Sequence, residues 1–349
     1  MKVLYLIDNY SLGGAQTIVK GIMENNTNNP EVFSIALRKK LPDIEIHNSN
    51  AICIESKSKF SLFPVFFIRK FITQHNIEIV HCQLPRSILF GYILKRFFFP
   101  KIKWIIHEQG DIFESKLYAF LLRQIYKKSN CNIACSKATA EMMHNRSQIP
   151  MNQVGILYNF VDLHRFVSLK KDDLKVYNIG FAGRIEKRKG WHEFIIAANL
   201  LQQQNLKFHI AGTGSETTPM HNLIHELKLN NLVNHGFVKE PEKFYSEIDL
   251  LIVPSHFEPM GMVAVEAMAC GVLVAASNVP GLNEVVKHDY NGWLLQSQSA
   301  SAIADTIKRI LLTDQDKLVK IQKNALLSVS EYSYKTFDLK MNKIYQILS

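Results

Sequence analysis

The chain has 349 residues, of which 47% are hydrophobic and 21% are charged. These proportions are ordinary for a soluble globular protein and exclude a disordered, collagen-like or coiled-coil chain. At roughly 150 residues per domain, the length predicts about two domains. No apolar run approaches the roughly 20 residues that a membrane-spanning helix needs, so we expect a cytoplasmic protein. The five cysteines are scattered, which is typical of small buried residues in a reducing compartment rather than of disulfides or a zinc site.

The formal net charge is +10, and nearly all of it lies in the first half of the chain. Residues 1–165 hold 21 Lys and Arg against 12 Asp and Glu, whereas residues 166–349 hold 20 against 19. A basic half beside a neutral half predicts that the first half meets something anionic. Nucleic acid, a phospholipid surface and a phosphorylated substrate all fit this charge.

Short β-type runs alternate with helical stretches along the first half. The expected strands cover residues 3–7, 33–37, 51–54, 77–81, 104–107 and 131–135, and the expected helices include residues 16–24 and 116–127. Strands separated by helical patterns of this length indicate βαβ units and a parallel sheet.

The same alternation restarts after residue 175. We expect strands at 176–182, 208–211, 250–253 and 272–276, and helices at 193–204, 262–269, 303–312, 316–328 and 335–348. Gly271 fits the C′ position of the helix 262–269. The fold class is therefore α/β, with two doubly wound domains. We place them at residues 1–165 and 166–330. A C-terminal helix follows at 331–349, and it could pack back on the first domain.

In open parallel sheets, ligands bind where a strand ends and the chain turns into a helix. Gly13 and Gly14 occupy such a loop, where a glycine pair permits close backbone approach and the helix N-terminus offers N–H groups to an anion. The alternative is a loop that only needs a positive φ. The G-x-G-x-x-G dinucleotide fingerprint is absent here, and at Gly212 and Gly214 the third glycine position holds Thr217.

A basic loop from Gly183 to Gly190 follows the strand 176–182, and within it Arg184 and Lys189 can place two cations over one site. Arg184 supplies a planar fork of donors and Lys189 a point charge, a combination that suits a diphosphate. The alternative is a solvated basic loop.

Two glutamates lie eight residues apart around the start of the helix 262–269. Glu258 precedes this helix, Gly261 stands at its start, and Glu266 lies within it among Ala, Val and Met. A carboxylate only accepts hydrogen bonds, so the pair could bind the vicinal hydroxyls of a sugar and of a ribose. The alternative is a capping group and a surface residue, but an acid on a mostly apolar helix needs a partner or a function.

Together these residues resemble a retaining glycosyltransferase of the GT-B fold, family 4. The resemblance covers residues 1 to about 330, and no single motif carries it. The matching segments are Leu12–Gln16, Gly183–Arg184 with Lys189–Gly190, the E-x7-E pair Glu258 and Glu266 with Pro259 and Gly261, Asn159–Asp162 with Phe166, Pro280–Glu284, and Asn291–Trp293.

The resemblance implies two Rossmann-like domains facing across a cleft, with a nucleotide-sugar held mainly by the second. Arg184 and Lys189 would neutralise the diphosphate, and backbone groups of Gly13 and Gly14 would reach it from the first domain. Glu266 would bind the ribose hydroxyls, and Glu258 would bind the sugar hydroxyls with help from the backbone N–H groups of Met260, Gly261 and Met262. The base would lie near Phe237 and Val238.

His107 ends an expected strand, and the resemblance implies that it borders the donor sugar; His81, at another strand end, competes for this role. His107 and Glu258 are therefore the candidate catalytic residues, although neither histidine is assigned as a simple general base. Family retention of configuration is usually ascribed to front-face attack, in which the leaving phosphate receives the acceptor proton. Without a D-x-D signal or a histidine–acid cluster, we expect no metal and no other cofactor, because Arg and Lys take the role of the cation.

Aromatic residues alternate with cations in two segments of the basic half, residues 59–72 and 95–101. This composition suits the headgroup boundary of an anionic membrane, so we expect peripheral contact with the inner face of the cell membrane. A buried helix with charged ends is the alternative.

The predicted function is sugar transfer from a nucleotide-sugar, expected to be UDP-linked, to a glycan or lipid-linked glycan in cell-surface polysaccharide or lipopolysaccharide synthesis. A nucleotide-sugar epimerase or hydrolase of the same fold is one alternative. A basic nucleic-acid-binding protein is another, but no recognised nucleic-acid motif is present, and we expect no nucleic-acid partner.

Overall fold

A computed structural model describes residues 1–11, 13–26, 30–39, 46, 48–56, 61–110, 123–167 and 175–349. They form two compact units, the first made of Met1–Phe160 and Tyr334–Ser349 and the second of Val161–Ser333. The chain therefore builds most of the first unit, then the second, and returns to the first with its last helix. The sequence-based division lay at residues 165 and 330.

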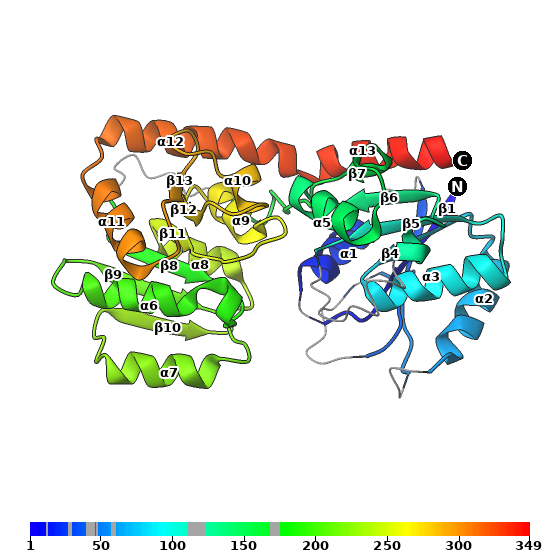
Figure 1. Ribbon diagram of the computed structural model, residues 1–349, viewed down its shortest axis with the longest axis horizontal. Helices are drawn as coiled ribbons and strands as arrows, with labels where there is room; N and C mark the ends of the chain where they lie inside the picture. The colour runs from blue at the N-terminus through cyan, green and yellow to red at the C-terminus, as the bar shows by residue number, and fades with distance from the viewer. Residues whose placement is uncertain are drawn as a thin grey trace. The chain divides into compact units, whose positions relative to one another are not determined.

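The first unit contains a seven-stranded parallel sheet in the order β3-β2-β1-β4-β5-β6-β7 (Figure 1). Its strands are β1 (Lys2–Ile7), β2 (Glu31–Ala36), β3 (Ala51–Cys53), β4 (Ile79–Gln83), β5 (Lys103–Glu108), β6 (Cys131–Ala134) and β7 (Val154–Ile156). Its described helices are α1 (Gly14–Asn25), α2 (Phe63–His75), α3 (Pro85–Phe97), α5 (Lys137–Ser147), the short 3-10 helix η1 (Met151–Gln153) and α13 (Tyr334–Leu348). Strand order reverses between β1 and β4, which places the loops after these two strands at a topological switch point.

Strand β1 shows why the sheet forms. Leu4 and Leu6 pack on one face against α2 and α3, whereas Val3, Tyr5 and Ile7 pack on the other against α1 and α13. A strand covered on both faces must be apolar at every position. The last helix closes the second face, where the Tyr5 and Tyr345 hydroxyls lie 2.6 Å apart in a hydrogen bond.

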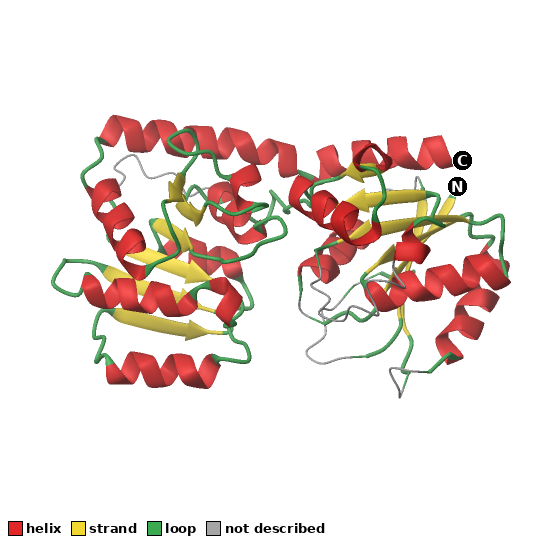
Figure 2. Cartoon of the chain, in the orientation of Figure 1, coloured by secondary structure: helices red, strands yellow, loops and turns green. Residues whose placement is uncertain are grey.

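The second unit contains a six-stranded parallel sheet in the order β10-β9-β8-β11-β12-β13. Its strands are β8 (Asn178–Ala182), β9 (Lys207–Ala211), β10 (Leu232–Gly236), β11 (Leu250–Val253), β12 (Leu273–Ser277) and β13 (Trp293–Leu295). Its helices are η2 (Lys187–Lys189), α6 (Trp191–Leu200), α7 (Thr217–Glu226), α8 (Pro241–Glu247), α9 (Met262–Ala269), α10 (Leu282–Val285), α11 (Ala300–Leu311), α12 (Gln315–Ser328) and η3 (Val329–Tyr332). Helices flank the strands of each unit (Figure 2).

The predicted α/β class with two parallel sheets is confirmed. Helix α9 has the predicted bounds, and Gly271 after it has φ 77°. The strand expected at 77–81 begins two residues later, because the Ile77 amide still donates to the Ile72 carbonyl oxygen at the end of α2. Residues 116–122 of the helix expected at 116–127 lie outside the described residues, and residues 123–126 are helical. No helix within the described residues is long and apolar enough to span a membrane.

Candidate functional site

In the second unit, the loops after β8 and β11 are joined by a backbone hydrogen bond. The His256 amide donates to the Arg188 carbonyl oxygen at 2.9 Å. Gly190 has φ 73°, and a Cβ atom there would collide with the Pro254 carbonyl oxygen. Only glycine therefore lets the two loops approach this closely, which fixes the positions of Lys189 and Glu258.

Lys189 and Glu258 form an ion pair between these loops. The Lys189 ammonium donates to Glu258 Oε2, and the two side chains are only 15% and 11% exposed. The Ser255 hydroxyl donates to the same oxygen at 3.3 Å. Because both contacts use Oε2, the second carboxylate oxygen can accept a hydrogen bond from a bound hydroxyl. The pair thus presents a cation and an acceptor in one place, whereas the sequence analysis had grouped Lys189 with Arg184 and Glu258 with Glu266.

The N-terminus of α9 lies beside this pair in the chain. Gly261 caps the helix with φ 83°, and Met260 before it is buried. The first N–H groups of a helix, here those of Met262 and Val263, have no acceptor within the helix. A Cβ atom on Gly281 would collide with the Glu258 carbonyl oxygen, so the loop before α10 holds this segment in place. Donor N–H groups and the Glu258 carboxylate therefore belong to one rigid turn.

Glu266 is half-buried on α9 and has a different partner. The Tyr245 hydroxyl of α8 donates to Glu266 Oε2 at 2.9 Å. Burial raises the pKa of Glu266 to about 7, while this hydrogen bond and the charge of Arg165 partly oppose the rise. Near neutral pH, Glu266 therefore exists in both its acid and its carboxylate form. The sequence identified Glu266 but not Tyr245.

Arg184 does not join the Lys189–Glu258 pair. Its side chain is 63% exposed, and its Nη1 atom lies 3.1 Å from Glu186 Oε1. Glu186 also accepts from Arg188 at 3.0 Å. Arg184 is thus a solvated guanidinium at the carboxyl end of β8.

The predicted base-binding residues Phe237 and Val238 directly follow β10. Phe237 is largely exposed, and the Gly212 amide donates to the Gly236 carbonyl oxygen at 2.7 Å, which joins the loops after β9 and β10. An exposed aromatic ring on a fixed loop can cover an aromatic base.

In the first unit, Gly13 and Gly14 begin α1. Gly13 has φ 173°, an extended conformation open to any residue, so a positive φ is not the reason for glycine here. A Cβ atom on Gly13 would lie 2.5 Å from the end of the Gln16 side chain, whereas one on Gly14 would meet nothing within 4 Å. Space over Gly14 fits the predicted approach of a ligand to the backbone. Leu12 of this motif lies outside the described residues.

The two candidate histidines differ sharply in their surroundings. His81 is part of the core, with its ring stacked on Tyr5 at 4.4 Å between centroids and its Nδ1 atom 3.1 Å from the Tyr345 hydroxyl. Its Nε2 atom has no hydrogen-bond partner among the described residues. His107 is also fully buried, but neither of its ring nitrogens has a hydrogen-bond partner among the described residues. Burial lowers the pKa of His107 to about 3, so the ring is neutral at physiological pH. A buried imidazole without partners is costly unless a ligand completes it.

Gln83 is a residue that sequence reasoning missed. It ends β4, lies opposite His107 in the register of β4 and β5, and is fully buried. Neither its amide oxygen nor its amide nitrogen has a hydrogen-bond partner in the described part of the chain. The available signal was a polar residue that closes an apolar strand at the switch point.

Comparison with known proteins identifies the family to which both units are similar. Residues 162–327 match the family model for glycosyl transferases group 1, and residues 24–165 match that for Glycosyltransferase Family 4. An uncharacterized glycosyltransferase of Methanocaldococcus jannaschii is 27% identical over 96% of this chain and 95% of its own length. A Campylobacter jejuni enzyme named N-acetylgalactosamine-N,N'-diacetylbacillosaminyl-diphospho-undecaprenol 4-alpha-N-acetylgalactosaminyltransferase is 26% identical over 90% of this chain and 91% of its own.

Two solved structures share the whole fold. Sucrose-phosphate synthase from Thermosynechococcus elongatus superposes with a TM-score of 0.83 at 22% identity, covering 99% of this chain and 98% of its own. Anabaena Alr3699/HepE, solved in complex with UDP and glucose, superposes with a TM-score of 0.84 at 21% identity, covering 99% of both chains. The chain is a glycosyltransferase of the GT-B fold. More particularly, residues 162–327 of its second unit match the family model for glycosyl transferases group 1.

Proposed function

We propose that this glycosyltransferase moves a hexose-type sugar from a UDP-linked donor, with retention of configuration and without a metal, to a glycan or lipid-linked glycan acceptor of cell-surface polysaccharide or lipopolysaccharide. The observation that carries the proposal is the shielded Lys189–Glu258 pair at the start of α9. It places a cation, a hydroxyl acceptor and helix N–H groups together, which is what a sugar diphosphate requires.

Cleavage of the sugar–phosphate bond develops negative charge on the leaving diphosphate. Lys189 and the N–H groups of Met260, Gly261 and Met262 stabilise that charge more than they stabilise the ground state. In this proposal the exposed Arg184 exchanges its contact with Glu186 for the diphosphate when the donor binds, and the backbone at Gly13 and Gly14 contacts the same group. The leaving phosphate oxygen takes the proton of the attacking acceptor hydroxyl, so no side chain acts as the base.

The donor's other parts have their own partners in this proposal. Glu258 accepts from sugar hydroxyls, Glu266 accepts from the ribose hydroxyls, and Phe237 and Val238 flank the base. His107 is neutral and offers one donor and one acceptor to the sugar, which would satisfy its buried nitrogens.

The names of similar proteins support the choice of donor and acceptor. Alr3699/HepE was solved with UDP and with UDP-glucose. The Campylobacter jejuni relative carries an alpha linkage and an undecaprenol-linked acceptor in its name.

The test is a donor screen followed by one matched pair of variants. UDP-, GDP- and ADP-sugars are compared by thermal shift, and the expected result is stabilisation by the UDP series, because a ligand of the folded state raises its stability. Lys189→Ala should then lower kcat about 100- to 1,000-fold, the usual effect of losing one transition-state donor. Lys187→Ala, an exposed lysine of the same turn, should leave kcat unchanged. Equal turnover in both variants would remove Lys189 from the site.

We also propose that the first unit contacts an anionic membrane through an aromatic surface on α2 and α3. This surface consists of Leu62, Phe63, Phe66 and Phe97, each between 58% and 66% exposed. Arg96 lies over the Phe97 ring at 5.6 Å. Exposed aromatic rings beside cations suit the boundary between acyl chains and anionic headgroups.

Vesicle sedimentation tests this contact. The protein should sediment with phosphatidylglycerol vesicles and remain in solution with phosphatidylcholine vesicles. Phe63→Ser with Phe66→Ser should abolish sedimentation, whereas Leu312→Ser, at an 85% exposed leucine of the second unit, should not. Sedimentation that is unaffected by the double variant would contradict the proposed surface.

A further inference from the structure

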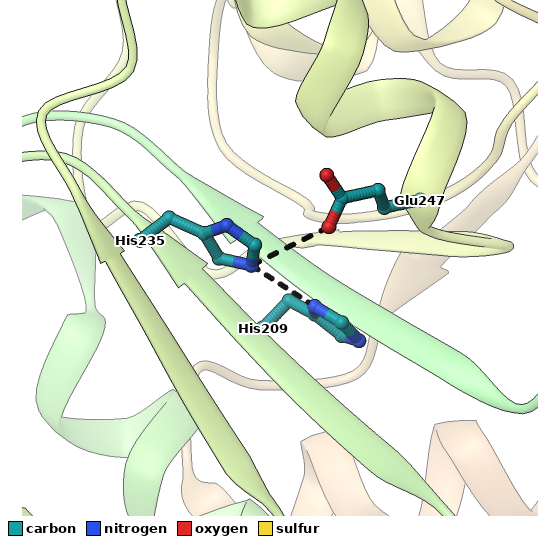
Figure 3. Close-up of side chains that lie close together, drawn as sticks. All are labelled: His209, His235 and Glu247. Carbon is teal, nitrogen blue, oxygen red and sulfur yellow. Dashed lines mark hydrogen bonds and ion pairs between the residues drawn. The ribbon is translucent and has the colours of Figure 1, made fainter.

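A cluster of two histidines and a glutamate lies in the second unit, apart from the residues assigned to the donor. His209 comes from the middle of β9, His235 from β10 and Glu247 from the last position of α8. Figure 3 shows the two imidazoles and the carboxylate pointing toward one another. Among the described residues, these three side chains form the one group of His, Cys, Asp and Glu that is compact enough to hold a metal ion.

We propose that His209, His235 and Glu247 bind a divalent transition-metal ion of the Zn²⁺ type. The His209 Nδ1 and His235 Nε2 atoms are 3.0 Å apart, and His235 Nε2 lies 3.9 Å from Glu247 Oε2. Tetrahedral zinc with bonds of about 2.0–2.2 Å separates its ligand atoms by roughly 3.3 Å. The His209–His235 distance is shorter than that value and the His235–Glu247 distance is longer, and all three ligand atoms lie within 4.8 Å of one another. The largely exposed Glu247 side chain must therefore move toward the two imidazoles to complete the site.

The hydrogen bonds around His209 fix the tautomer that a metal requires. Asp249 Oδ2 accepts from the Asn178 side-chain nitrogen at 3.2 Å, so the Asn178 oxygen faces the other way, toward His209. That oxygen lies 3.2 Å from His209 Nε2 and can only accept. His209 therefore carries its proton on Nε2 and directs the lone pair of Nδ1 at His235. A ligating histidine whose second nitrogen donates to a protein oxygen is the usual arrangement in metal sites.

A β-bulge gives His235 its direction. The register of β9 and β10 shifts between Asn234 and Gly236, which makes His235 the extra residue of its strand. Bulges re-aim a side chain at the cost of ladder pairing. Here the bulge brings the two rings to an interplanar angle of 25°, with nitrogen facing nitrogen.

Charge and solvent access also suit a bound cation. Glu247 supplies the negative charge. The His235 side chain is 19% exposed and that of Glu247 is 53% exposed, so water can fill the remaining coordination positions. Two imidazoles and one carboxylate favour Zn²⁺ and its neighbours over Mg²⁺, which prefers oxygen ligands.

A metal here would tie two strands to α8 at the edge of the sheet. His235 precedes Phe237 by two residues, so the ion would anchor the end of β10 from which the loop with Phe237 and Val238 begins. This inference does not depend on the identity of the donor, and it places the metal outside the Lys189–Glu258 pair, where the chemistry requires none.

Metal binding to the full chain tests the inference directly. After chelator treatment and desalting, Zn²⁺ titrated by calorimetry should bind at one ion per chain and raise the melting temperature, whereas Mg²⁺ should do neither. Co²⁺ should give the visible absorption of nitrogen- and oxygen-ligated tetrahedral cobalt. Glu247→Gln and His235→Ala should each weaken Zn²⁺ binding by at least about tenfold, because second-shell changes alone cost about 10- to 100-fold.

The control is His225→Ala, at an exposed histidine of α7, which should leave the affinity for Zn²⁺ unchanged. Glu247 is largely exposed, so Glu247→Gln keeps the test decisive if His235→Ala does not fold. Absence of Zn²⁺ binding, or equal binding by the wild type and Glu247→Gln, would reduce the cluster to a hydrogen-bonded histidine pair and overturn the inference.

Discussion

Glu266→Gln should raise the free energy of unfolding, and the gain should increase with pH. The reason is that ionisation of the half-buried Glu266 carboxyl group opposes folding. Burial raises the pKa of Glu266 from an ordinary value of 4.5 to about 7. The folded state therefore binds more protons than the unfolded state between these two pH values, so stability falls as the pH rises through that window. At about 1.4 kcal/mol per pKa unit, the penalty reaches about 3 kcal/mol above pH 8 and is absent below pH 4.5.

The glutamine variant lacks this penalty and keeps an oxygen that accepts from Tyr245. Urea unfolding followed by circular dichroism should therefore show a stability gain over the wild type of about 3 kcal/mol at pH 8.5 and about 1 kcal/mol at pH 5.5. Glu226→Gln, at an exposed glutamate of α7, should give no gain at either pH. A gain that is the same at both pH values would refute the argument that ionisation of Glu266 opposes folding.

The same variant tests the proposed role of Glu266 in binding the donor. Loss of a charged acceptor weakens binding by roughly 1.5–3 kcal/mol, so the UDP affinity measured by calorimetry should fall about 10- to 100-fold at pH 8.5. In the wild type, the affinity should itself decline as the pH drops below about 7. Unchanged UDP affinity in a stabilised variant would assign Glu266 to another purpose.

Three further changes test the remaining site residues. Lys189→Ala should lower the free energy of unfolding by about 3–5 kcal/mol, because it leaves the Glu258 carboxylate buried and unpaired. In urea unfolding, the double variant with Glu258→Ala should recover much of that loss. A simple sum of the two single effects would refute the coupling between the two side chains. His107→Asn should lower kcat about 10- to 100-fold, and because burial lowers the pKa of His107 to about 3, the wild-type rate between pH 5 and 9 should show no inflection from this ring. Gly14→Ala should stabilise the fold by about 0.4–1 kcal/mol, because alanine lowers the conformational entropy of the unfolded state. The same variant should raise the KM for the donor. An unchanged KM would mean that no ligand uses the space over Gly14.

Sequence periodicity predicted the elements that are long, apolar and bounded by clear signals. Strand β1 is an unbroken apolar run because it is covered on both faces, and Gly271 marks the end of α9. It did not predict β10, whose residues Leu232–Gly236 are only partly buried and contain a bulge. Edge strands of this kind have neither a continuous apolar run nor strict alternation.

Some residues of the candidate site could likewise be identified from the sequence, and others could not. Lys189 and Glu258 were identifiable because each follows a strand, and the structure pairs them. Contacts made between distant elements carry no local signal. Tyr245 meets Glu266 from another helix, and the two histidines of the cluster lie 26 residues apart on neighbouring strands. Such pairs become visible only when the sheet register is known.

The return of α13 to the first unit has a consequence for biosynthesis. Phe337, Met341 and Tyr345 cover one face of the sheet that begins with β1, although more than 300 residues separate them in the chain. On the ribosome, the amino-terminal half would therefore emerge with that face covered by α1 but not yet by residues 334–349. A fragment cut at residue 160 would keep an exposed apolar face and need the last helix, added as a peptide or joined by circular permutation, to become a closed domain.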